Sequence, residues 1–395
     1  MRVLVAHNLY RQAGGEDVVV RAERALLVGA GHEVVTYFRR NRAILLNGFV
    51  SRTRLAVETV WARDSHRTLR ELIASKKPQV AHFHNTLPLI SPSAYYACRE
   101  AGIPVVQTLH NYRLLCSAAT LFRDGHVCEE CIEHSLLRGI HYGCYRDSRS
   151  ATAAVAAMLG THRLLGTWSE QVDCYIALTE FSRHKFAAAG LPVEKIVVKP
   201  NFVHPDPGPR DAAGDYALFV GRLSAEKGLR TLLAGWRRLD QCFPLRVVGD
   251  GPLRSEMEGG INGAKEIHFA GRLPREQTLA AIKRARFLVF PSEWYECSPM
   301  TLIEALACGV PVIASRLGAM AEIVTDGQTG LHFTAGDADD LAGKVEWAWT
   351  HPQEMEAMGR AARAEYEVKY TAARNYQLLM GIYQKAACGD GSRLQ

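Results

Sequence analysis

Short runs of apolar, often β-branched residues alternate along the chain with longer stretches whose apolar positions recur at helical spacing. The first series of runs predicts strands at 2–6, 32–38, 80–84, 105–109, 174–178 and 196–198, and an amphipathic helix at 16–30. A second series predicts strands at 216–220, 245–248, 267–269, 287–290 and 310–314. Apolar strands separated by helices are typical of parallel sheets covered on both faces. We therefore expect an α/β protein with two doubly wound, Rossmann-like domains that face a central cleft.

A segment rich in Pro and Gly at 201–214 separates the two series of strands, and it predicts an interdomain linker. The expected N-terminal domain covers 1–203 and carries a cysteine-rich insert at 111–148. The expected second domain covers 204–370. A helical stretch at 371–388 is predicted to pack back on the first domain, and 389–395 is predicted to be a tail.

The composition indicates a globular protein and gives little support for nucleic-acid binding. The 395 residues are 48% hydrophobic and 22% charged, which is ordinary for a globular protein, and the formal net charge is +6. This mild excess of Lys and Arg suits phosphate groups or an anionic surface but is weak support for nucleic-acid binding, and we expect none. No run of 18 apolar residues predicts a transmembrane helix, and the first residues fit a strand better than a signal peptide. We expect a cytoplasmic protein.

The ends of the second-domain strands carry candidate ligand-binding residues, because ligands of doubly wound sheets bind at the carboxyl ends of the strands. In the segment 220–228, Gly221 permits a turn, and Arg222 and Lys227 supply two cations close to a helix N-terminus. Together they could neutralise a diphosphate without a metal ion. A surface turn with two solvated cations is the alternative.

Two carboxylates follow the predicted strand at 287–290. Glu296 lies in the loop before the next helix, and Glu304 lies one turn inside that helix. A carboxylate accepts hydrogen bonds from neighbouring hydroxyls, which suits the hydroxyl groups of a sugar. The alternative is that Glu304 is a surface charge beside a packed apolar face.

The order of these motifs resembles the retaining glycosyltransferases of family 4. It runs Gly-Arg-x4-Lys-Gly from Gly221, then Val-Gly-Asp-Gly-Pro, then Phe-Ala-Gly-Arg-Leu-Pro, then Glu-x7-Glu-Ala from Glu296. The resemblance covers nearly the whole chain and implies the two-domain GT-B fold. It also implies transfer of a sugar from a nucleoside diphosphate sugar, with 1–203 on the acceptor side and 204–370 binding the donor.

The resemblance also assigns roles to the second-domain residues. It implies that Arg222 and Lys227 bind the diphosphate, that Glu304 accepts the ribose hydroxyls, and that Glu296 holds the donor sugar as a catalytic residue. The backbone around Ser298 and Met300 would supply the remaining sugar contacts.

In the first domain, the loop containing Gly15 resembles the double-glycine loop of the family, where the backbone approaches a ligand closely. His110 follows the strand predicted at 105–109, where the family has a functional histidine near the donor sugar. His84, at the end of the neighbouring strand, is the competing candidate. The resemblance implies retention without a protein nucleophile, with Arg222 and Lys227 stabilising the departing diphosphate.

Four cysteines in the insert are spaced Cys-x11-Cys-x2-Cys-x12-Cys, and the turn at 123–126 between them predicts a hairpin. This spacing favours a closed structural zinc site. The ligands would be Cys116, Cys128, Cys131 and Cys144. An iron–sulfur cluster, disulfides or four unrelated thiols are the alternatives. We expect no cofactor to be required for catalysis.

The sequence thus predicts a metal-independent retaining glycosyltransferase acting on a glycan or lipid-linked acceptor in cell-surface polysaccharide or glycolipid assembly. A sugar-nucleotide epimerase of the same fold, and a non-catalytic protein that binds sugar nucleotides or nucleic acid, are the rival interpretations. Basic residues between 39 and 77 further suggest peripheral contact with the inner face of an anionic membrane, although a solvated helical face explains them equally well.

Overall fold

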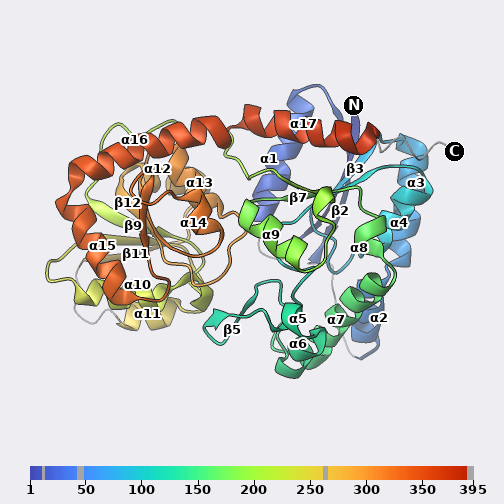
Figure 1. The fold of residues 1–395 in the computed structure, drawn as a ribbon, viewed down its shortest axis with the longest axis horizontal. Helices are drawn as coiled ribbons and strands as arrows, with labels where there is room; N and C mark the ends of the chain where they lie inside the picture. Colours follow the sequence, from blue (N-terminus) through green and yellow to red (C-terminus); the bar gives the residue numbers. More distant parts are fainter. Residues whose placement is uncertain (11–13, 42–48, 261–265, 389–395) are drawn as a thin grey trace. The chain divides into compact units, whose positions relative to one another are not determined.

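Two six-stranded parallel sheets organise the computed structural model, which describes residues 1–10, 14–41, 49–260 and 266–388 (Figure 1). Each sheet belongs to its own compact unit. Unit 1 comprises Met1–Leu121, Cys128–Pro200 and the chain from Asn375 onward. Unit 2 comprises Phe122–Val127 and Asn201–Arg374. The two sheets confirm the predicted pair of Rossmann-like folds, and the predicted tail at 389–395 lies outside the described residues.

The sheet of unit 1 has the strand order β2-β1-β3-β4-β7-β8, and all its strands run parallel. The six predicted strands of this half are confirmed. Their bounds are β1 Arg2–Leu9, β2 Glu33–Arg40, β3 Val80–Phe83, β4 Val105–Thr108, β7 Cys174–Ala177 and β8 Ile196–Val198. The direction of winding reverses between β1 and β3, so the topological switch point of this sheet lies between those two strands.

Helices cover the sheet of unit 1. They are α1 Gly15–Gly29, α2 Phe49–Val60, α3 Arg63–Lys76, α4 Ser93–Glu100, α7 Arg149–Leu164, α8 Thr167–Glu170, α9 Glu180–Ala188 and α17 Ala372–Cys388. The predicted helix at 16–30 corresponds to α1. One core cluster joins Val20 of α1 and Val106 of β4 to Leu379 and Tyr383 of α17. The last described helix therefore completes the core of unit 1.

The insert after β4 holds a two-stranded antiparallel hairpin formed by β5 Phe122–Arg123 and β6 His126–Val127. Asp124 and Gly125 occupy its turn with φ values of 52° and 81°. Positive φ at both central residues suits the twist of a tight hairpin, which explains why Asp-Gly predicted the turn correctly. Two short helices follow, α5 Glu130–Glu133 and α6 Leu136–Tyr142.

The sheet of unit 2 has the order β11-β10-β9-β12-β13-β14, with its switch point between β9 and β12. The bounds are β9 Tyr216–Val220, β10 Leu245–Val248, β11 Ile267–Gly271, β12 Ala285–Phe290, β13 Val312–Ser315 and β14 Gly330–Phe333. The sequence did not predict β14, whose four residues include a Gly and a His. It also placed the start of β13 at 310, whereas the strand begins after Pro311, which has no amide hydrogen to donate.

Two separate cores cover the two faces of this sheet. Alternate residues of β9 enter different cores, since Leu218 packs in one and Phe219 in the other. The helical elements are η3 Ala225–Lys227, α10 Leu229–Arg238, α11 Arg254–Gly260, α12 Arg275–Lys283, α13 Met300–Ala307, α14 Ala319–Ile323, α15 Ala338–Thr350 and α16 Pro352–Lys369. Helices α12, α13 and α14 cover the first core, and α10 and α15 cover the second.

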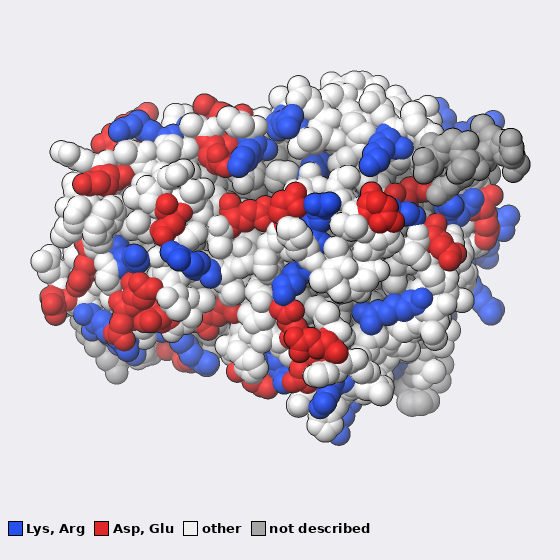
Figure 2. Space-filling model, in the orientation of Figure 1, with Lys and Arg blue, Asp and Glu red and all other residues white. Residues whose placement is uncertain are grey.

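Charge is mixed over the surface. On the face drawn in Figure 2, acidic and basic side chains are interspersed within each unit. Several of the basic residues that suggested membrane contact are paired with acids: Arg39 and Arg67 with Asp64, and Arg54 with Glu58. Arg42, part of the same prediction, lies outside the described residues. None of the described helices is both long enough and apolar enough to cross a bilayer.

Candidate functional site

The loops that follow the central strands of unit 2 approach one another closely at glycines. Gly249, after β10, has a φ of 146°, and a Cβ built there would lie 1.8 Å from the carbonyl oxygen of Gly221. Only a glycine fits a backbone approach this close. The amide of Gly221 donates to the carbonyl of Val248 over 3.0 Å, which fixes the start of the loop after β9.

Gly228 allows a similar close approach between the loops that follow β9 and β12, the two strands at the switch point. Its φ is 67°, and a Cβ there would lie 1.7 Å from the carbonyl oxygen of Pro291, the first residue after β12. The amide of Glu293 donates to the carbonyl of Glu226 over 2.9 Å. The short helix η3, which ends at Lys227, is therefore packed against the loop that carries Glu296.

Lys227 and Glu296 meet in this arrangement. The Nζ atom of Lys227 lies 2.5 Å from Oε1 of Glu296, and the hydroxyl of Ser292 donates to the same oxygen over 2.7 Å. The ammonium group also faces the Trp294 ring at 5.1 Å and the Phe290 ring at 5.8 Å from their centroids. The side chain of Glu296 is 8% exposed and that of Lys227 is 18% exposed. The structure thus brings together two predicted site residues 69 positions apart.

The other predicted residues of unit 2 lie in the same strand-end loops and in the helix after them. Arg222 is exposed and forms no ion pair with the described residues. Glu304 lies in α13, with a side chain 12% exposed and Oε1 3.5 Å from Nε of Arg275. Burial raises the pKa of Glu304, and the charge of Arg275 opposes that shift.

The segment before α13 contains an unsatisfied hydroxyl. Ser298 is buried, and its Oγ has no hydrogen-bond partner among the described residues. Its carbonyl accepts from the side-chain amide of Asn201 over 2.9 Å. Met300 is the first residue of α13, so its amide lies at the free N-terminus of that helix. Unpaired donors at this point can bind an oxygen-rich ligand.

In unit 1, Gly15 is the exposed first residue of α1, and Gly14 is its N-cap. The next residue, Glu16, shows an unusual carboxyl group. The pKa of Glu16 is raised to about 8, chiefly by burial and also by the neighbouring Asp17, while the Tyr10 hydroxyl opposes the shift. Nδ1 of His7 lies 3.8 Å from Oε1 of Glu16. A protonated carboxyl therefore follows the glycine loop at neutral pH.

His110 and His84 follow the adjacent parallel strands β4 and β3. Nδ1 of His84 lies 2.9 Å from Nε2 of His110, and the two rings are stacked with their centroids 5.2 Å apart. His84 is buried, whereas part of His110 stays exposed. The two histidines that the sequence offered as competing candidates are therefore hydrogen-bonded partners.

Two charged residues of this neighbourhood were missed by the sequence analysis. Glu23 of α1 is 2% exposed, and Lys199, just after β8, is fully buried. Their Oε1 and Nζ atoms lie 2.5 Å apart. The available signals were a carboxylate on the apolar face of α1 and a lysine directly after a strand, both places where a charge needs a partner.

The four insert cysteines lie in one neighbourhood but do not form a compact ligand set. Burial raises the pKa of the Cys131 thiol to about 11, and Cys116, Cys144 and Cys128 are close enough to add to the shift. Among the described residues, the group of three or more metal-binding side chains with ligand atoms within 4.8 Å of one another is Glu23, His82 and His84, not the cysteines. A tetrahedral zinc site has bonds of about 2.3 Å, so it would require these thiols to move closer together.

Comparison of the sequence with known protein families assigns the chain to a family. The sequence profile of "Glycosyltransferase Family 4" matches residues 13–207, and that of "Glycosyl transferases group 1" matches residues 205–365. The chain belongs to the group 1, family 4 glycosyltransferases, and its two parallel-sheet units are those of the GT-B fold.

Individual relatives agree with this assignment. D-rhamnosyltransferase WbpZ of Pseudomonas aeruginosa is 34% identical over 169 residues, which cover 42% of each chain. Glycogen synthase of Mycobacterium tuberculosis is 27% identical over 73% of this chain and 64% of that protein. The chain covers less than half the length of the first of these relatives and less than two thirds of the second.

Solved structures share the fold along almost the whole chain. Sucrose-phosphate synthase of Thermosynechococcus elongatus has a TM-score of 0.72 at 17% identity, and the match covers 99% of this chain and 100% of that protein's chain. Anabaena HepE in complex with UDP has a TM-score of 0.67 at 17% identity, with 98% and 100% covered.

Proposed function

We propose that the protein transfers a sugar from a nucleoside diphosphate sugar to a glycan or lipid-linked acceptor, with retention at the transferred carbon. The pairing of Lys227 with Glu296 at the switch point of unit 2 is the observation that carries this proposal. It puts a cation suited to a diphosphate beside a carboxylate suited to sugar hydroxyls. The Anabaena relative was solved with UDP, and also with UDP and glucose, which supports a donor of this class.

The ion pair suggests how the donor is received. Lys227 and Glu296 are ion-paired in the structure. A diphosphate would supply oxygen atoms that compete for the ammonium group, and the released carboxylate would then accept hydroxyl hydrogen bonds from the sugar. In this proposal Arg222 supplies the second cation, because it is exposed and forms no ion pair with a described residue. Glu304 accepts from the ribose, and the backbone from Ser298 to Met300 contacts the sugar.

The chemical step is electrostatic in this proposal. The two cations stabilise the negative charge that develops on the leaving diphosphate, which is the kind of contribution that dominates many transfer reactions. His110 contributes its imidazole through a hydrogen bond to the sugar. No metal ion is required. The setting we propose is the assembly of cell-surface polysaccharide or glycolipid.

Mass spectrometry of reactions with a panel of nucleoside diphosphate sugars tests the proposal. We expect one donor to release its nucleoside diphosphate and to transfer its sugar when acceptor is added. Lys227→Ala should lower turnover at least tenfold. Lys369→Ala, which removes an exposed ion-paired lysine of the same unit, is the matched control. Equal turnover by both variants would remove Lys227 from the site.

The product also separates the rival functions. An isomerised sugar still attached to its nucleotide would indicate an epimerase, an activity that the relatives described above do not support. Binding of a sugar nucleotide without any turnover, in the presence of every acceptor tested, would indicate a non-catalytic protein.

We also propose a peripheral contact between unit 1 and an anionic membrane surface. Arg52, Arg63 and Lys77 carry it, because they are exposed and have no ion-pair partner among the described residues. Each basic residue near such a surface contributes roughly 1 kcal/mol.

A further inference from the structure

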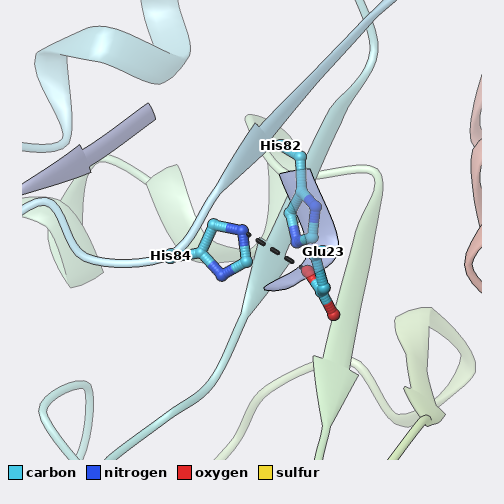
Figure 3. Close-up of side chains that lie close together, drawn as sticks. All are labelled: Glu23, His82 and His84. Atoms are coloured by element: carbon cyan, nitrogen blue, oxygen red, sulfur yellow. Dashed lines mark ion pairs between the residues drawn. The ribbon is translucent and has the colours of Figure 1, made fainter. Parts of the chain in front are cut away.

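Four buried or partly buried polar side chains of unit 1 form a continuous series that ends at His110. It starts at Lys199, passes through the Glu23 carboxylate and the His84 imidazole, and ends at His110. Oε1 of Glu23 accepts from Lys199 over 2.5 Å, and Oε2 of Glu23 lies 3.6 Å from Nε2 of His84. Figure 3 shows the Glu23 carboxylate, on α1, beside the rings of His82 and His84 from β3 and its end. Nδ1 of His84 then contacts Nε2 of His110 at 2.9 Å.

The cluster of Glu23, His82 and His84 has the spacing of a metal site, but both ring nitrogens of its His82 already have hydrogen-bond partners. Both ring nitrogens of His82 are hydrogen-bonded, Nδ1 to the Tyr383 hydroxyl and Nε2 to the Thr108 hydroxyl, each over 2.7 Å. The ammonium group of Lys199 neutralises Glu23 from the other side. A metal ion would have to replace one of these short hydrogen bonds of His82 and lie close to the buried ammonium group of Lys199, so we assign the cluster a different task.

The proton positions in this series follow from its partners. Burial lowers the pKa of His84 and of His110 well below the ordinary value, and His82, His7 and Lys199 lower both further, so both rings are neutral at pH 7. A neutral imidazole has one donor nitrogen and one acceptor nitrogen. Oε2 of Glu23 is a buried acceptor without a hydrogen-bond partner among the described residues, and it faces Nε2 of His84. That nitrogen must therefore carry the proton of His84.

The tautomer of His84 then determines the tautomer of His110. With its proton on Nε2, His84 presents Nδ1 as an acceptor, so the short contact to His110 requires a proton on Nε2 of His110. The lone pair of His110 is left on Nδ1, which forms no hydrogen bond with a described residue. We propose that the ion pair of Glu23 and Lys199 and the ring of His84 position His110 in the tautomer that accepts a hydrogen bond. Building on the proposed function, this acceptor faces a sugar hydroxyl, not a phosphate.

Nitrogen-15 spectra of the histidine rings in the full chain test this proposal without any substrate. His110→Gln assigns the signals of His110 by their loss. We expect Nε2 of His110 to be protonated and Nδ1 to be unprotonated at pH 7. A protonated Nδ1 would overturn the proposal, and so would a charged ring.

A variant of the ion pair tests the origin of the tautomer. Glu23→Gln alone would leave Lys199 buried and unpaired, which is strongly destabilising. The double variant Glu23→Leu with Lys199→Met removes both charges at similar volume, a change that is often neutral for folding. We expect His110 in this folded variant to become a mixture of both tautomers. An unchanged single tautomer would show that Glu23 does not set it.

Kinetics then distinguish positioning from a merely structural role. His84→Leu should lower kcat about tenfold or more while the KM of the donor changes less than threefold. His84→Asn offers an oxygen near the place of Nδ1, and we expect it to restore most of the lost kcat. Equal losses in both variants would contradict the proposal. If no donor is turned over by the wild type, the proposed function fails, while the spectra still decide the tautomer.

Discussion

The buried ion pair of Glu23 and Lys199 could not be predicted from the sequence. They are 176 positions apart, and nothing in the local pattern of either one indicates the other. The strand-end rule correctly pointed to His84 and His110, since it depends only on the order of strands. It could not show that the two rings are bonded, because that depends on the register of β3 against β4. The sequence therefore predicted that both histidines follow strands of the sheet, and the structure showed that they are hydrogen-bonded to each other.

Glu16 gives a residue-scale prediction about pH. Its pKa is about 8 in the folded protein and near 4.5 in the unfolded chain, so between these values the folded state binds more protons. Stability contributed by this proton is complete below about pH 4.5 and is lost as pH rises through about 8. Glu16→Gln removes the effect. We expect the free energy of unfolding of the variant, relative to that of the wild type, to increase as pH rises from 6 to 8.5. The increase is at most about 1.4 kcal/mol per pH unit.

Thermal or denaturant unfolding of both proteins at the two pH values measures this gain. Glu71→Gln, a change at an exposed residue of α3, is the control and should leave the difference flat. A Glu16→Gln protein whose advantage does not grow with pH would show that the carboxyl is ionised in the folded state.

At the scale of elements, the loop between β9 and α10 depends on Gly228. The residue needs a left-handed φ and leaves no room for a Cβ beside Pro291. We expect Gly228→Ala to destabilise unit 2 by more than about 1 kcal/mol and to weaken donor binding, because η3 must move away from the loop of Glu296. Gly343→Ala is the matched control. That glycine lies inside α15 with nothing within 4 Å, so the change should stabilise by up to about 1 kcal/mol.

Denaturant unfolding and calorimetric titration with the preferred nucleoside diphosphate give both quantities for each variant. If Gly228→Ala behaved like Gly343→Ala, the close approach to Pro291 would not be important for the site.

The insert 111–148 gives a second prediction at this scale. Three of its cysteines lie near the fourth, Cys131, but the four thiols do not reach metal-ligand spacing in the described part of the chain. We propose that zinc draws them together, and we expect one zinc ion per chain in protein purified without chelator. Cys131→Ser should lose the metal and lower the melting temperature by several degrees, whereas Cys242→Ser, at an exposed cysteine outside the insert, should change neither. Metal-free protein of equal stability would end the zinc hypothesis.

The elements themselves were predictable to different degrees. Strands such as β1 and β9 contain continuous apolar runs of at least four residues, and they were found within a few residues. The strand β14 was not found, because Gly-Leu-His-Phe is too short and too mixed to stand out from a loop. Its pairing with β13, not its own sequence, makes it a strand.

At the scale of the whole molecule, the proposed membrane contact can be measured directly. We expect the protein to co-sediment with vesicles that contain phosphatidylglycerol and not with vesicles of phosphatidylcholine alone. A triple change of Arg52, Arg63 and Lys77 to Glu should abolish the binding, since it reverses three charges that have no internal partner among the described residues. Equal binding to neutral vesicles, or binding by the triple variant, would contradict this electrostatic contact.

The helix α17 has a consequence for the order in which the protein can fold. Its residues Leu379, Ile382 and Tyr383 complete the core of unit 1, and Tyr383 holds the ring of His82. A ribosome makes the six strands of unit 1 first, then Asn201–Arg374, which form most of unit 2, and only afterwards the part of this helix that belongs to unit 1. The core of unit 1 therefore stays incomplete while about 175 further residues are synthesised. Loss of the chain from Asn375 onward would leave unit 2 with all of its own residues but would remove the Tyr383 hydroxyl that is hydrogen-bonded to His82 in unit 1.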